Sequence, residues 1–250
     1  MRAIIIAAGR GSRLGDHTDE RPKCMVEVGG RSILSYQLEA LRAHGVDDLH
    51  VVRGYLADRL VVPGATYYLN EDWPRNNILG SLFFAEEALE GDLLTTYSDI
   101  VYGAEVVEAA LGGDADVTLV VDREWARAYE GRHDHPVEQA ELVELAEGGR
   151  VSRVGKWVGS ERAVGEFIGL ARFTARGAEA MREAWAAIHA SHDPEGPWRH
   201  ADPMRKAYLA DMLEELVDRG VHVGVAMIDG GWREIDTVED LARVGQDGWG

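Results

Sequence analysis

The stretch MRAIIIAAGRGSRLG, residues 1–15, joins a continuous apolar run to a glycine-rich turn. Residues 3–8 are all apolar, which is typical of a strand buried on both faces. Three glycines and Ser12 then allow the backbone to turn sharply, so that its N–H groups can point into a concavity suited to phosphate oxygens. This segment therefore predicts both the first strand of an α/β fold and a phosphate-binding loop.

Cationic residues gather around this turn although the whole chain is strongly acidic. The chain has 26 Lys and Arg residues against 44 Asp and Glu residues, a formal net charge of −18. Four of the cations lie in or just after the turn: Arg10, Arg13, Arg21 and Lys23. Pro22 fixes the chain before Lys23, a compact charge able to follow phosphate oxygens. We therefore expect a polyphosphate ligand, with a plain strand-to-helix turn carrying surface arginines as the alternative.

The turn does not match two common phosphate-binding motifs. No Gly-Lys-Ser/Thr closes it, so it is not a Walker loop. Leu14 stands where the dinucleotide-binding fingerprint needs its third glycine, which arrives one residue late. Neither an NTPase P-loop nor a dinucleotide-binding Rossmann motif is therefore expected.

Length and composition bound the remaining classes. At 250 residues, with 46% hydrophobic residues, the chain fits one large α/β domain or two small ones. It contains no apolar run long enough to cross a bilayer. Its single cysteine, Cys24, is expected to be a buried hydrophobe or else a reactive thiol beside Lys23. The negative charge argues against nucleic acid and anionic membranes as partners. We expect a cytoplasmic protein, with a homodimer left open.

Strand and helix patterns alternate along the chain. Strands are expected at residues 1–8, 49–52, 65–69, 92–97, 117–121 and 221–228, and helices after residue 32 and at 79–89, 105–111, 178–189 and 204–219. Residues 143–158 and 167–173 resemble antiparallel strands, with Gly148-Gly149 as a turn, and the polar segment 124–135 resembles a lid. The fold class expected is α/β, with a Rossmann-like mixed, mainly parallel sheet flanked by helices and a small antiparallel part.

The residues of the turn resemble a known signature. Ala7-Ala8-Gly9-x-Gly11-Ser12-Arg13-Leu14, followed by Arg21-Pro22-Lys23, is similar to the motif of the sugar-nucleotide pyrophosphorylase and cytidylyltransferase superfamily. The resemblance continues through Asn76-Asn77, Ser81-Leu82, Ser98-Asp99, residues 165–169 (GEFIG) and residues 233–237 (REIDT). The most similar members are the short cytidylyltransferases that act on phosphocholine and on phosphonates in antibiotic biosynthesis.

This resemblance implies a fold and an organisation. The fold would be the GT-A-like nucleotidyltransferase fold in a single domain, residues 1–250. A nucleotide-binding half would reach to about residue 110, and an acceptor-binding and lid half would cover about 111–250. A phosphate or phosphonate acceptor is already ionised near neutral pH, so that catalysis would depend on neutralising charge rather than on a general base.

Two carboxylates are the candidate metal ligands. Asp99 follows a buried strand, at the edge of an α/β sheet where ligands bind, and Asp236 ends a second strand-like segment. Carboxylates from distant segments can hold Mg²⁺ and leave sites for phosphate oxygens. The resemblance assigns both to the metal site. The alternative for each is a helix N-cap.

The resemblance also assigns residues to the nucleotide. Lys23 and Arg13 match catalytic cations that contact the phosphates, and Asn77 and Ser81 match positions near the base. An amide and a hydroxyl can read the edge of cytosine, although capping the helix near Leu79 is the alternative for both. The full nucleotide-binding set is Ala8, Gly9, Gly11, Ser12, Arg13, Lys23, Asn77 and Ser81.

Acceptor residues are expected in the second half. Lys156 matches a catalytic lysine that contacts the acceptor's phosphoryl group, and Arg132 is a further candidate for anion capture; surface roles are the alternative for both. Glu166 faces the acceptor or pairs with a cation. Five aromatic residues of this half would either form a box around the quaternary ammonium of choline or pack at the rim of the lid: Trp125, Tyr129, Trp157, Trp198 and Tyr208. Among these, Trp125 is the acceptor-binding candidate.

Two local features are interpreted as structural. His133-Asp134-His135 shows no third ligand in the sequence, so a zinc site is rejected. Asp211 is expected to hold the helix beside it.

The function expected is Mg²⁺-dependent cytidylyl transfer. CTP and a small phosphonate, of the hydroxyalkyl-, aminoethyl- or phosphonoformate type, would give a CMP-linked product and pyrophosphate. The alternatives are a phosphocholine cytidylyltransferase, a sugar-1-phosphate nucleotidyltransferase, and a nucleotide-sensing module without turnover.

Overall fold

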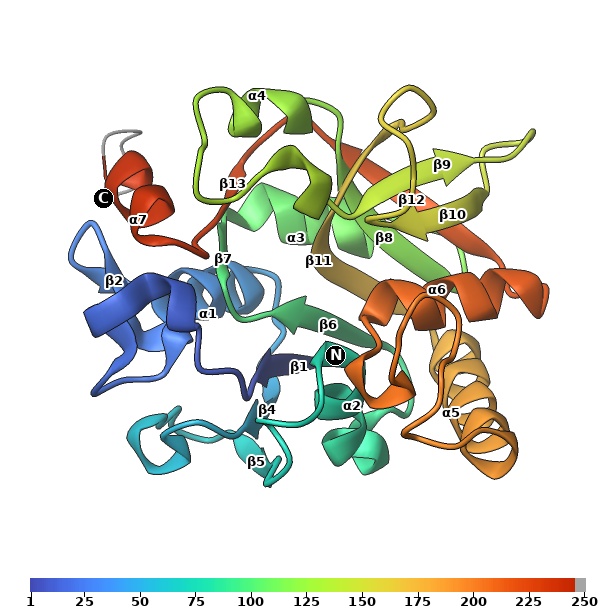
Figure 1. The fold of residues 1–250 in the computed structure, drawn as a ribbon, viewed down its shortest axis with the longest axis horizontal. Helices are drawn as coiled ribbons and strands as arrows, with labels where there is room; N and C mark the ends of the chain where they lie inside the picture. Colours follow the sequence, from blue (N-terminus) through green and yellow to red (C-terminus); the bar gives the residue numbers. More distant parts are fainter. Residues whose placement is uncertain (246–250) are drawn as a thin grey trace.

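The first strand lies in the middle of the main sheet. In the computed structural model, which describes residues 1–245, β1 (Arg2–Ala7) pairs in parallel with β4 (Asp48–Arg53) and with β6 (Leu93–Tyr97). A further parallel strand, β5 (Thr66–Leu69), pairs with β4. Ile4 and Ile5 are fully buried, which confirms a strand covered on both faces. Figure 1 shows the N-terminus at the centre of the molecule.

The other side of β6 is antiparallel. There β11 (Gly165–Phe173) runs against β6, β8 (Val117–Asp122) and β9 (Leu142–Leu145), and β10 (Val151–Gly155) runs against β9. The strand β12 (Val223–Ile228) pairs in parallel with β8 and completes the nine-stranded sheet. The expected mixed, mainly parallel sheet and the antiparallel pair around Gly148-Gly149 are confirmed.

Two short sheets flank the main one. In one, β2 (Glu27–Val28) pairs with β3 (Arg31–Ser32). In the other, β7 (Ile100–Tyr102) pairs antiparallel with β13 (Trp232–Glu234), which joins the middle of the chain to its C-terminal part.

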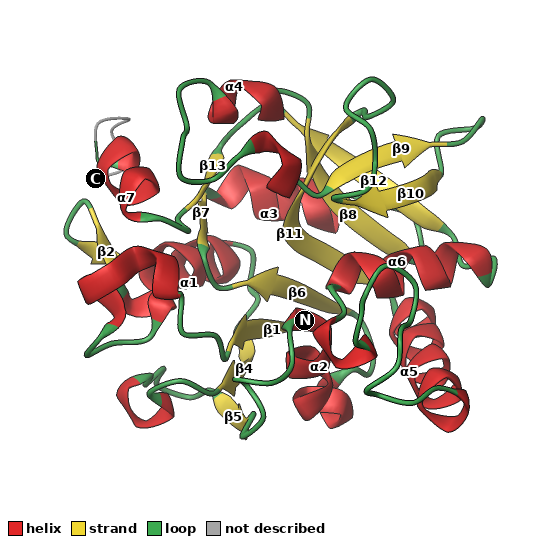
Figure 2. Ribbon diagram, in the orientation of Figure 1, coloured by secondary structure: helices red, strands yellow, loops and turns green. Residues whose placement is uncertain are grey.

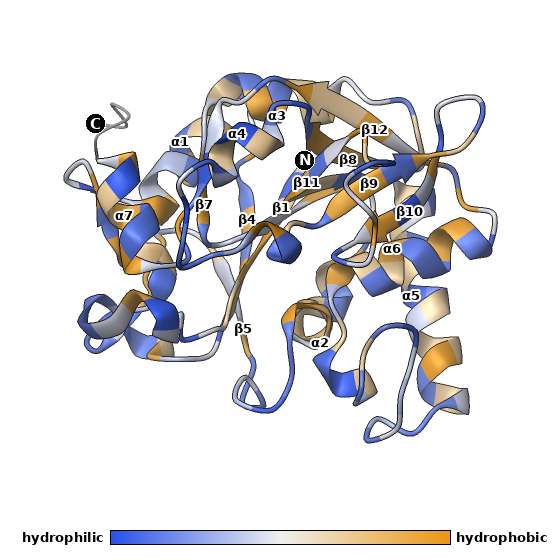
Figure 3. Ribbon diagram, turned by 45° about the horizontal axis from the view of Figure 1, so that its top comes forward, coloured by the Kyte–Doolittle hydropathy of each residue, from blue (hydrophilic) through white to orange (hydrophobic). Residues whose placement is uncertain are grey.

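Helices cover both faces of the sheet (Figure 2). One face carries α2 (Ile78–Leu82), α5 (Ala175–Ser191) and α6 (Leu209–Asp218), and the other carries α1 (Ile33–Ala43) and α3 (Ala104–Leu111). Ile4 and Ile6 of β1 pack toward the first group, and Ala3 and Ile5 toward the second, because side chains alternate along a strand. Figure 3 shows hydrophobic and hydrophilic residues side by side on α6, as expected of a helix with one buried face.

Some predicted boundaries are wrong. The helix expected at 79–89 is α2 followed by a 3₁₀ segment, Phe83–Ala88. The helix expected at 204–219 begins only at Leu209, since Met204–Lys206 forms a separate 3₁₀ turn. Asp211 has the structural role expected of it, because its carboxylate accepts hydrogen bonds from the backbone N–H groups of Tyr208 and His200.

Two short helices complete the described chain. The segment 124–135 contains α4 (Trp125–Tyr129), and α7 (Val238–Val244) follows β13. Within residues 1–245, no helix has the length and apolar character that a membrane span requires.

Candidate active site

The glycine-rich loop leaves the carboxyl end of β1 and passes directly over Lys23. Gly11 adopts a φ of +68°, a conformation that glycine takes at little cost. A Cβ atom at this position would lie 2.7–3.0 Å from the side-chain carbons of Lys23. Gly11 is therefore needed both for the turn and for the passage of the lysine side chain beneath it.

Lys23 lies between two carboxylates. Its Nζ atom is 2.8 Å from Asp99 Oδ2 and 2.6 Å from Asp236 Oδ1, and its side chain is buried. Burial alone would lower the pKa of Lys23, but the charges of Asp99 and Asp236 raise it above its ordinary value. Arg13 forms an ion pair with the other oxygen of Asp236. Four of the residues identified from the sequence thus converge at one point.

The pairing of β7 with β13 brings the two aspartates together. Asp99 lies between β6 and β7, and the N–H of Ile235 donates to the Asp99 carbonyl at 2.8 Å. Ile235 also packs with Leu14 and Val101 in a small apolar cluster, which fixes this segment against the loop after β1. Asp99 and Asp236, which are 137 positions apart in the sequence, are therefore brought together by one short antiparallel pair of strands.

Neither aspartate caps a helix. Asp99 is followed by a strand, and α3 begins only after Gly103. The N-cap of α7 is Thr237, whose side chain accepts from Asp240 N–H. The capping alternatives for Asp99 and Asp236 are therefore wrong, and both carboxylates are left to face the loop.

These carboxylates fit a hard divalent cation. Asp99 Oδ1 is buried and has no hydrogen-bond partner among the described residues. Burial alone would raise the pKa of Asp236, but contact with His135 and the charge of Lys23 hold it well below its ordinary value. Two ionised oxygen donors from separate segments, one with an unused oxygen, match the ligand chemistry of Mg²⁺.

Further potential ligands lie beside Asp236. His135 Nδ1 is 3.1 Å from Asp236 Oδ2, and ligand atoms of His135, Glu234 and Asp236 all lie within 4.8 Å of one another. The sequence showed no third ligand for the His133-Asp134-His135 segment, whereas the structure places Glu234 at the end of β13 and Asp236 just after it beside His135 alone. His135 therefore extends the polar group around the candidate metal site.

A cavity of about 310 Å³ lies above the loop. The eight residues expected to bind the nucleotide all line it, together with Asp99 and Asp236. Within it, the Asn77 side chain donates to the Lys206 carbonyl rather than capping α2, and Ser81 accepts from the buried Asn70 amide at 2.9 Å. Asn76 and Trp73 also line this cavity, and sequence reasoning missed both as contributors.

A second cavity, of about 370 Å³, adjoins the first. Arg13, Asp99 and Asp236 line both, so the two spaces meet at the candidate metal site. Lys156 lies on the wall of the second cavity, with its Nζ 3.0 Å from Gln139 Oε1 and 4.4 Å from the centre of the Tyr208 ring. The expected acceptor lysine thus faces a space that opens onto the nucleotide cavity.

Buried acids give the second cavity its character. Burial raises the pKa of Glu141 to about 7, although Lys156 and a hydrogen bond from Tyr97 oppose the shift. Burial likewise raises the pKa of Glu166 to about 8, against the effect of a 2.6 Å hydrogen bond from the Tyr129 hydroxyl. Both carboxyl groups line the cavity, and each would bind a cation or a proton readily.

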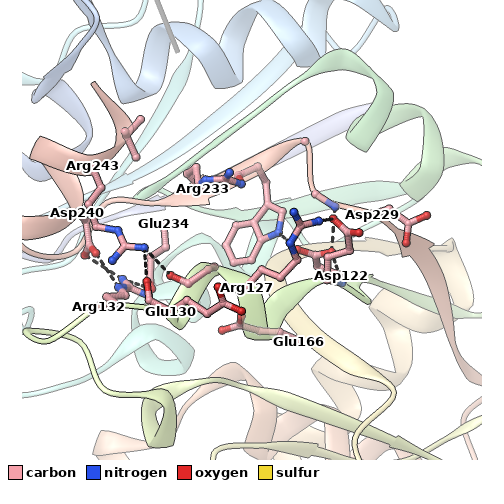
Figure 4. A pocket seen from close by; sticks show the side chains of 16 residues that line it. Asp122, Arg127, Glu130, Arg132, Glu166, Asp229, Arg233, Glu234, Asp240 and Arg243 are labelled. Atoms are coloured by element: carbon pink, nitrogen blue, oxygen red, sulfur yellow. Dashed lines mark hydrogen bonds and ion pairs between the residues drawn. The ribbon is translucent and has the colours of Figure 1, made fainter. Parts of the chain in front are cut away.

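Arg132 does not line the cavity that holds Lys156. Its Nε lies 2.6 Å from Asp240 Oδ1 and a terminal nitrogen lies 2.9 Å from Glu234 Oε2, in a side chain that is only 5% exposed. Figure 4 shows these contacts in a third, larger cavity of about 490 Å³. These ion pairs join α7 to β13 and favour a structural role for Arg132, and its expected capture of the acceptor's anion stays a prediction.

Of the two alternatives given for the aromatic residues, the structure favours packing for the three tryptophans. Trp125 packs edge-on against Tyr129 in a small apolar cluster and does not line the cavity of Lys156. Trp157 stacks on His200, and Trp198 belongs to the main core. Trp125 thus has a packing role, and its expected contact with the acceptor stays a prediction. Cys24 is also buried, and burial raises the pKa of its thiol to about 12.

Sequence reasoning missed several residues of the second cavity. Glu234 lies two positions before Asp236 at the end of a strand, and this spacing, which places side chains on the same side, is a signal that could have indicated it. Tyr97, directly before Ser98-Asp99, offered a similar signal. His135 belongs to the His133-Asp134-His135 segment, which was rejected as a zinc site, and no pattern in the sequence marks Gln139 or Glu141, which only the fold places here.

Comparison with known proteins identifies the family. Residues 3–146, more than half of the chain, match the family described as the MobA-like NTP transferase domain. The chain therefore belongs to this family of nucleotidyltransferases.

Individual relatives extend the comparison. The chain is 29% identical to the CTP:phosphoglutamine cytidylyltransferase of Campylobacter jejuni, over 96% of this chain and 98% of that protein. It is 35% identical to the CMP-5'-(3-aminopropyl)phosphonate synthase of Streptomyces rubellomurinus, over 43% of this chain and 18% of that protein. The solved structure of the CTP:phosphocholine cytidylyltransferase from Streptococcus pneumoniae matches with a TM-score of 0.75 and 20% identity, over 98% of both chains, and thus shares the fold.

Proposed function

We propose that this NTP transferase is a Mg²⁺-dependent cytidylyltransferase, which joins CMP from CTP to a small phosphonate or phosphate monoester. The observation that carries the proposal is the meeting of two cavities at Asp99 and Asp236, with Lys23 and Arg13 at the junction. A triphosphate above the loop would present its α-phosphorus toward the cavity of Lys156. The chain would bring the two substrates together at this point.

The reaction balances without a proton acceptor. An anionic oxygen of the acceptor attacks the α-phosphorus of CTP and forms a new P–O bond. The bond between the α-phosphorus and the oxygen bridging to the β-phosphate breaks, and pyrophosphate leaves with the electron pair. The acceptor oxygen is already ionised near neutral pH, so no side chain has to act as a general base.

The side chains would act by binding and by neutralising charge. Lys23 and Arg13 would contact the phosphates, and the backbone of residues 8–12 would cradle them. Lys156 would hold the phosphoryl group of the acceptor. Mg²⁺ held by Asp99 and Asp236 would supply further positive charge to the phosphate oxygens.

CTP and a phosphonate acceptor are supported by the relatives and by the motifs. The relatives from C. jejuni and S. rubellomurinus are both named for cytidylyl or CMP products. The GEFIGL segment, residues 165–170, and Asp122-Arg123-Glu124-Trp125 resemble phosphonate nucleotidyltransferases, whereas the N-terminal motif resembles that of the whole superfamily. Phosphocholine is less well supported, because the three tryptophans expected in an aromatic box lie outside the cavity of Lys156. A sensing module would not need the combination of Lys23, Asp99 and Asp236.

A substrate matrix tests the proposal. CTP, UTP, ATP, GTP and dTTP are each incubated with Mg²⁺ and with 2-aminoethylphosphonate, 2-hydroxyethylphosphonate, phosphonoformate, phosphocholine or glucose 1-phosphate. We expect pyrophosphate release and a CMP-linked product, detected by mass spectrometry, only with CTP, and with the phosphonates turned over faster than phosphocholine or glucose 1-phosphate. Binding of CTP without product from any acceptor would favour the sensing module instead.

A further inference from the structure

Glu166 lines both the cavity of Lys156 and the larger cavity of Arg132 (Figure 4), and one of its carboxylate oxygens is unused. Glu166 lies on β11 and is 5% exposed. Its Oε1 accepts the hydrogen bond from Tyr129, whereas Oε2 is buried and has no hydrogen-bond partner among the described residues. A buried carboxylate oxygen without a donor is costly, because it has lost water and gained nothing in exchange. A ligand that carries a donor into this cavity would remove that cost.

The charges around the cavity define what that donor can be. Its lining includes the acidic residues Asp99, Glu141, Glu166, Glu234 and Asp236 and only two cationic ones, Arg13 and Lys156. Lys23 and Arg13 already neutralise Asp99 and Asp236, and Arg132 pairs with Glu234 from outside. Among the described residues, the charge of Lys156 acts on Glu141, whereas the charge of Arg132 acts on Glu166 from the larger cavity. Burial raises the pKa of Glu141 to about 7 and that of Glu166 to about 8, so a cation that enters the cavity would favour the ionised form of both carboxyl groups.

We propose that Glu166 receives a primary ammonium group on the tail of the acceptor, so that the substrate class is the aminoalkyl phosphonates or phosphates. This inference rests on the proposed function and names its acceptor more narrowly. An N–H⁺ donor would form a charge-assisted hydrogen bond with the unused oxygen. A carboxylate tail, as in phosphonoformate, would be repelled by the acids. A quaternary ammonium brings no N–H and would leave Oε2 unsatisfied.

A pair of nearly isosteric acceptors tests the inference. The wild-type enzyme is assayed with CTP, Mg²⁺ and either 2-aminoethylphosphonate or 2-hydroxyethylphosphonate, and the ratio of the two kcat/KM values is the readout. We expect the amine to be preferred roughly 10- to 100-fold, the range that corresponds to one hydrogen bond to a charged group. The N,N,N-trimethyl derivative of the amine should lose most of this preference.

Two matched variants locate the preference. Glu166→Gln keeps the shape of the side chain and removes its charge, so the ratio should fall to near one. Glu147→Gln makes the same change on an exposed turn outside the three cavities, and should leave the ratio unchanged. If Glu166→Gln fails to fold, the wild-type enzyme still tests the ammonium site, because equal kcat/KM values for the amine and its trimethyl derivative would overturn it.

The outcomes separate this inference from the proposed function. Turnover with equal kcat/KM for the amine and the alcohol would overturn the ammonium site and retain the cytidylyltransferase. A ratio that stays unchanged in Glu166→Gln would assign the preference to another residue and overturn the role of Glu166. If no acceptor turned over, the proposed function would fail. Calorimetric titration of the same two phosphonates would then decide, and equal affinities would overturn the ammonium site as well.

Discussion

The two cavities that meet at Asp99 and Asp236 are built from different chemistry. The nucleotide cavity is lined by a glycine-rich backbone, small side chains, Lys23 and Arg13, which suit a polyanion. The adjoining cavity is lined by Tyr97, Phe167, Tyr208 and several buried acids, with Lys156 as its own cation. One side thus offers positive charge and backbone donors, and the other offers carboxylates within an aromatic wall.

This difference shows how one fold can divide two tasks. A triphosphate presents the same phosphate oxygens in every nucleotide, so that a short local motif is enough to bind them. An acceptor tail differs from one substrate to another, and its recognition depends on side chains that distant loops bring together. Changes in the first cavity should therefore affect turnover of every acceptor, whereas changes in the second should affect the choice among acceptors.

The largest effect is expected at the junction. Asp236→Asn keeps the size of the side chain but removes the charge that faces Lys23 and Arg13. We expect kcat to fall roughly 100- to 1,000-fold with every acceptor, the cost of losing one preorganised electrostatic contact. The thermal stabilisation produced by Mg²⁺ together with CTP should fall as well. Steady-state kinetics and a thermal-shift titration measure the two effects.

A matched control accompanies this variant. Asp218→Asn makes the same change on the exposed end of α6, where the carboxylate pairs with Arg199, and should keep both kcat and the Mg²⁺ effect. A near-wild-type kcat for Asp236→Asn would remove Asp236 from the metal site and break the proposed meeting point.

A smaller and more selective effect is expected at Lys156. Lys156→Ala should raise the KM of the phosphonate acceptor about tenfold, the order of one charge-assisted hydrogen bond, while the KM of CTP changes little. Lys206→Ala is the control, because Lys206 lines none of the three cavities and its side chain contacts backbone carbonyls. An increase confined to the KM of CTP would place Lys156 in the nucleotide cavity and reverse its assignment.

The smallest effect concerns stability and pH in the second cavity. Glu141 has its pKa raised from 4.5 to about 7 by burial, with Lys156, Tyr97, Glu234 and Asp211 as its charged and titratable neighbours. Between these values the folded protein holds a proton that the unfolded chain has released, so that the free energy of unfolding falls as the pH rises and the contribution is lost above about 7.

This pH effect can be measured by difference. Urea unfolding of the ligand-free protein at pH 5 and pH 8 should show a loss of about 1 to 3 kcal/mol that Glu141→Gln lacks. An identical pH dependence in the variant would contradict the burial of a neutral Glu141.

The nucleotide cavity could be predicted from the sequence to a greater extent than the adjoining cavity. The first strand, the glycine turn and Lys23 lie within 23 residues, and local rules of strand burial and turn geometry were enough to predict them. Asp99 and Asp236 could be proposed because each follows a strand, although their contact depends on the pairing of β7 with β13.

The second cavity could not be predicted in this way. Arg132 looked like a free cation in the sequence, yet Asp240 and Glu234 occupy it. Trp125 looked like a ligand-binding ring and packs in an apolar cluster. Glu141 carries no local signal at all, because its environment comes from a loop folded against β6 and β11. Long-range packing determines which charged side chains are free to bind a ligand, and no short sequence pattern indicates this packing.

A crystal structure with Mg²⁺, α,β-methylene-CTP and 2-aminoethylphosphonate tests the central claim most directly. The account predicts the triphosphate on residues 8–13 beside Lys23, Mg²⁺ in contact with Asp99 and Asp236, and the acceptor's phosphoryl group beside Lys156. A nucleotide bound instead in the larger cavity of Arg132, or a metal ion distant from both aspartates, would contradict it.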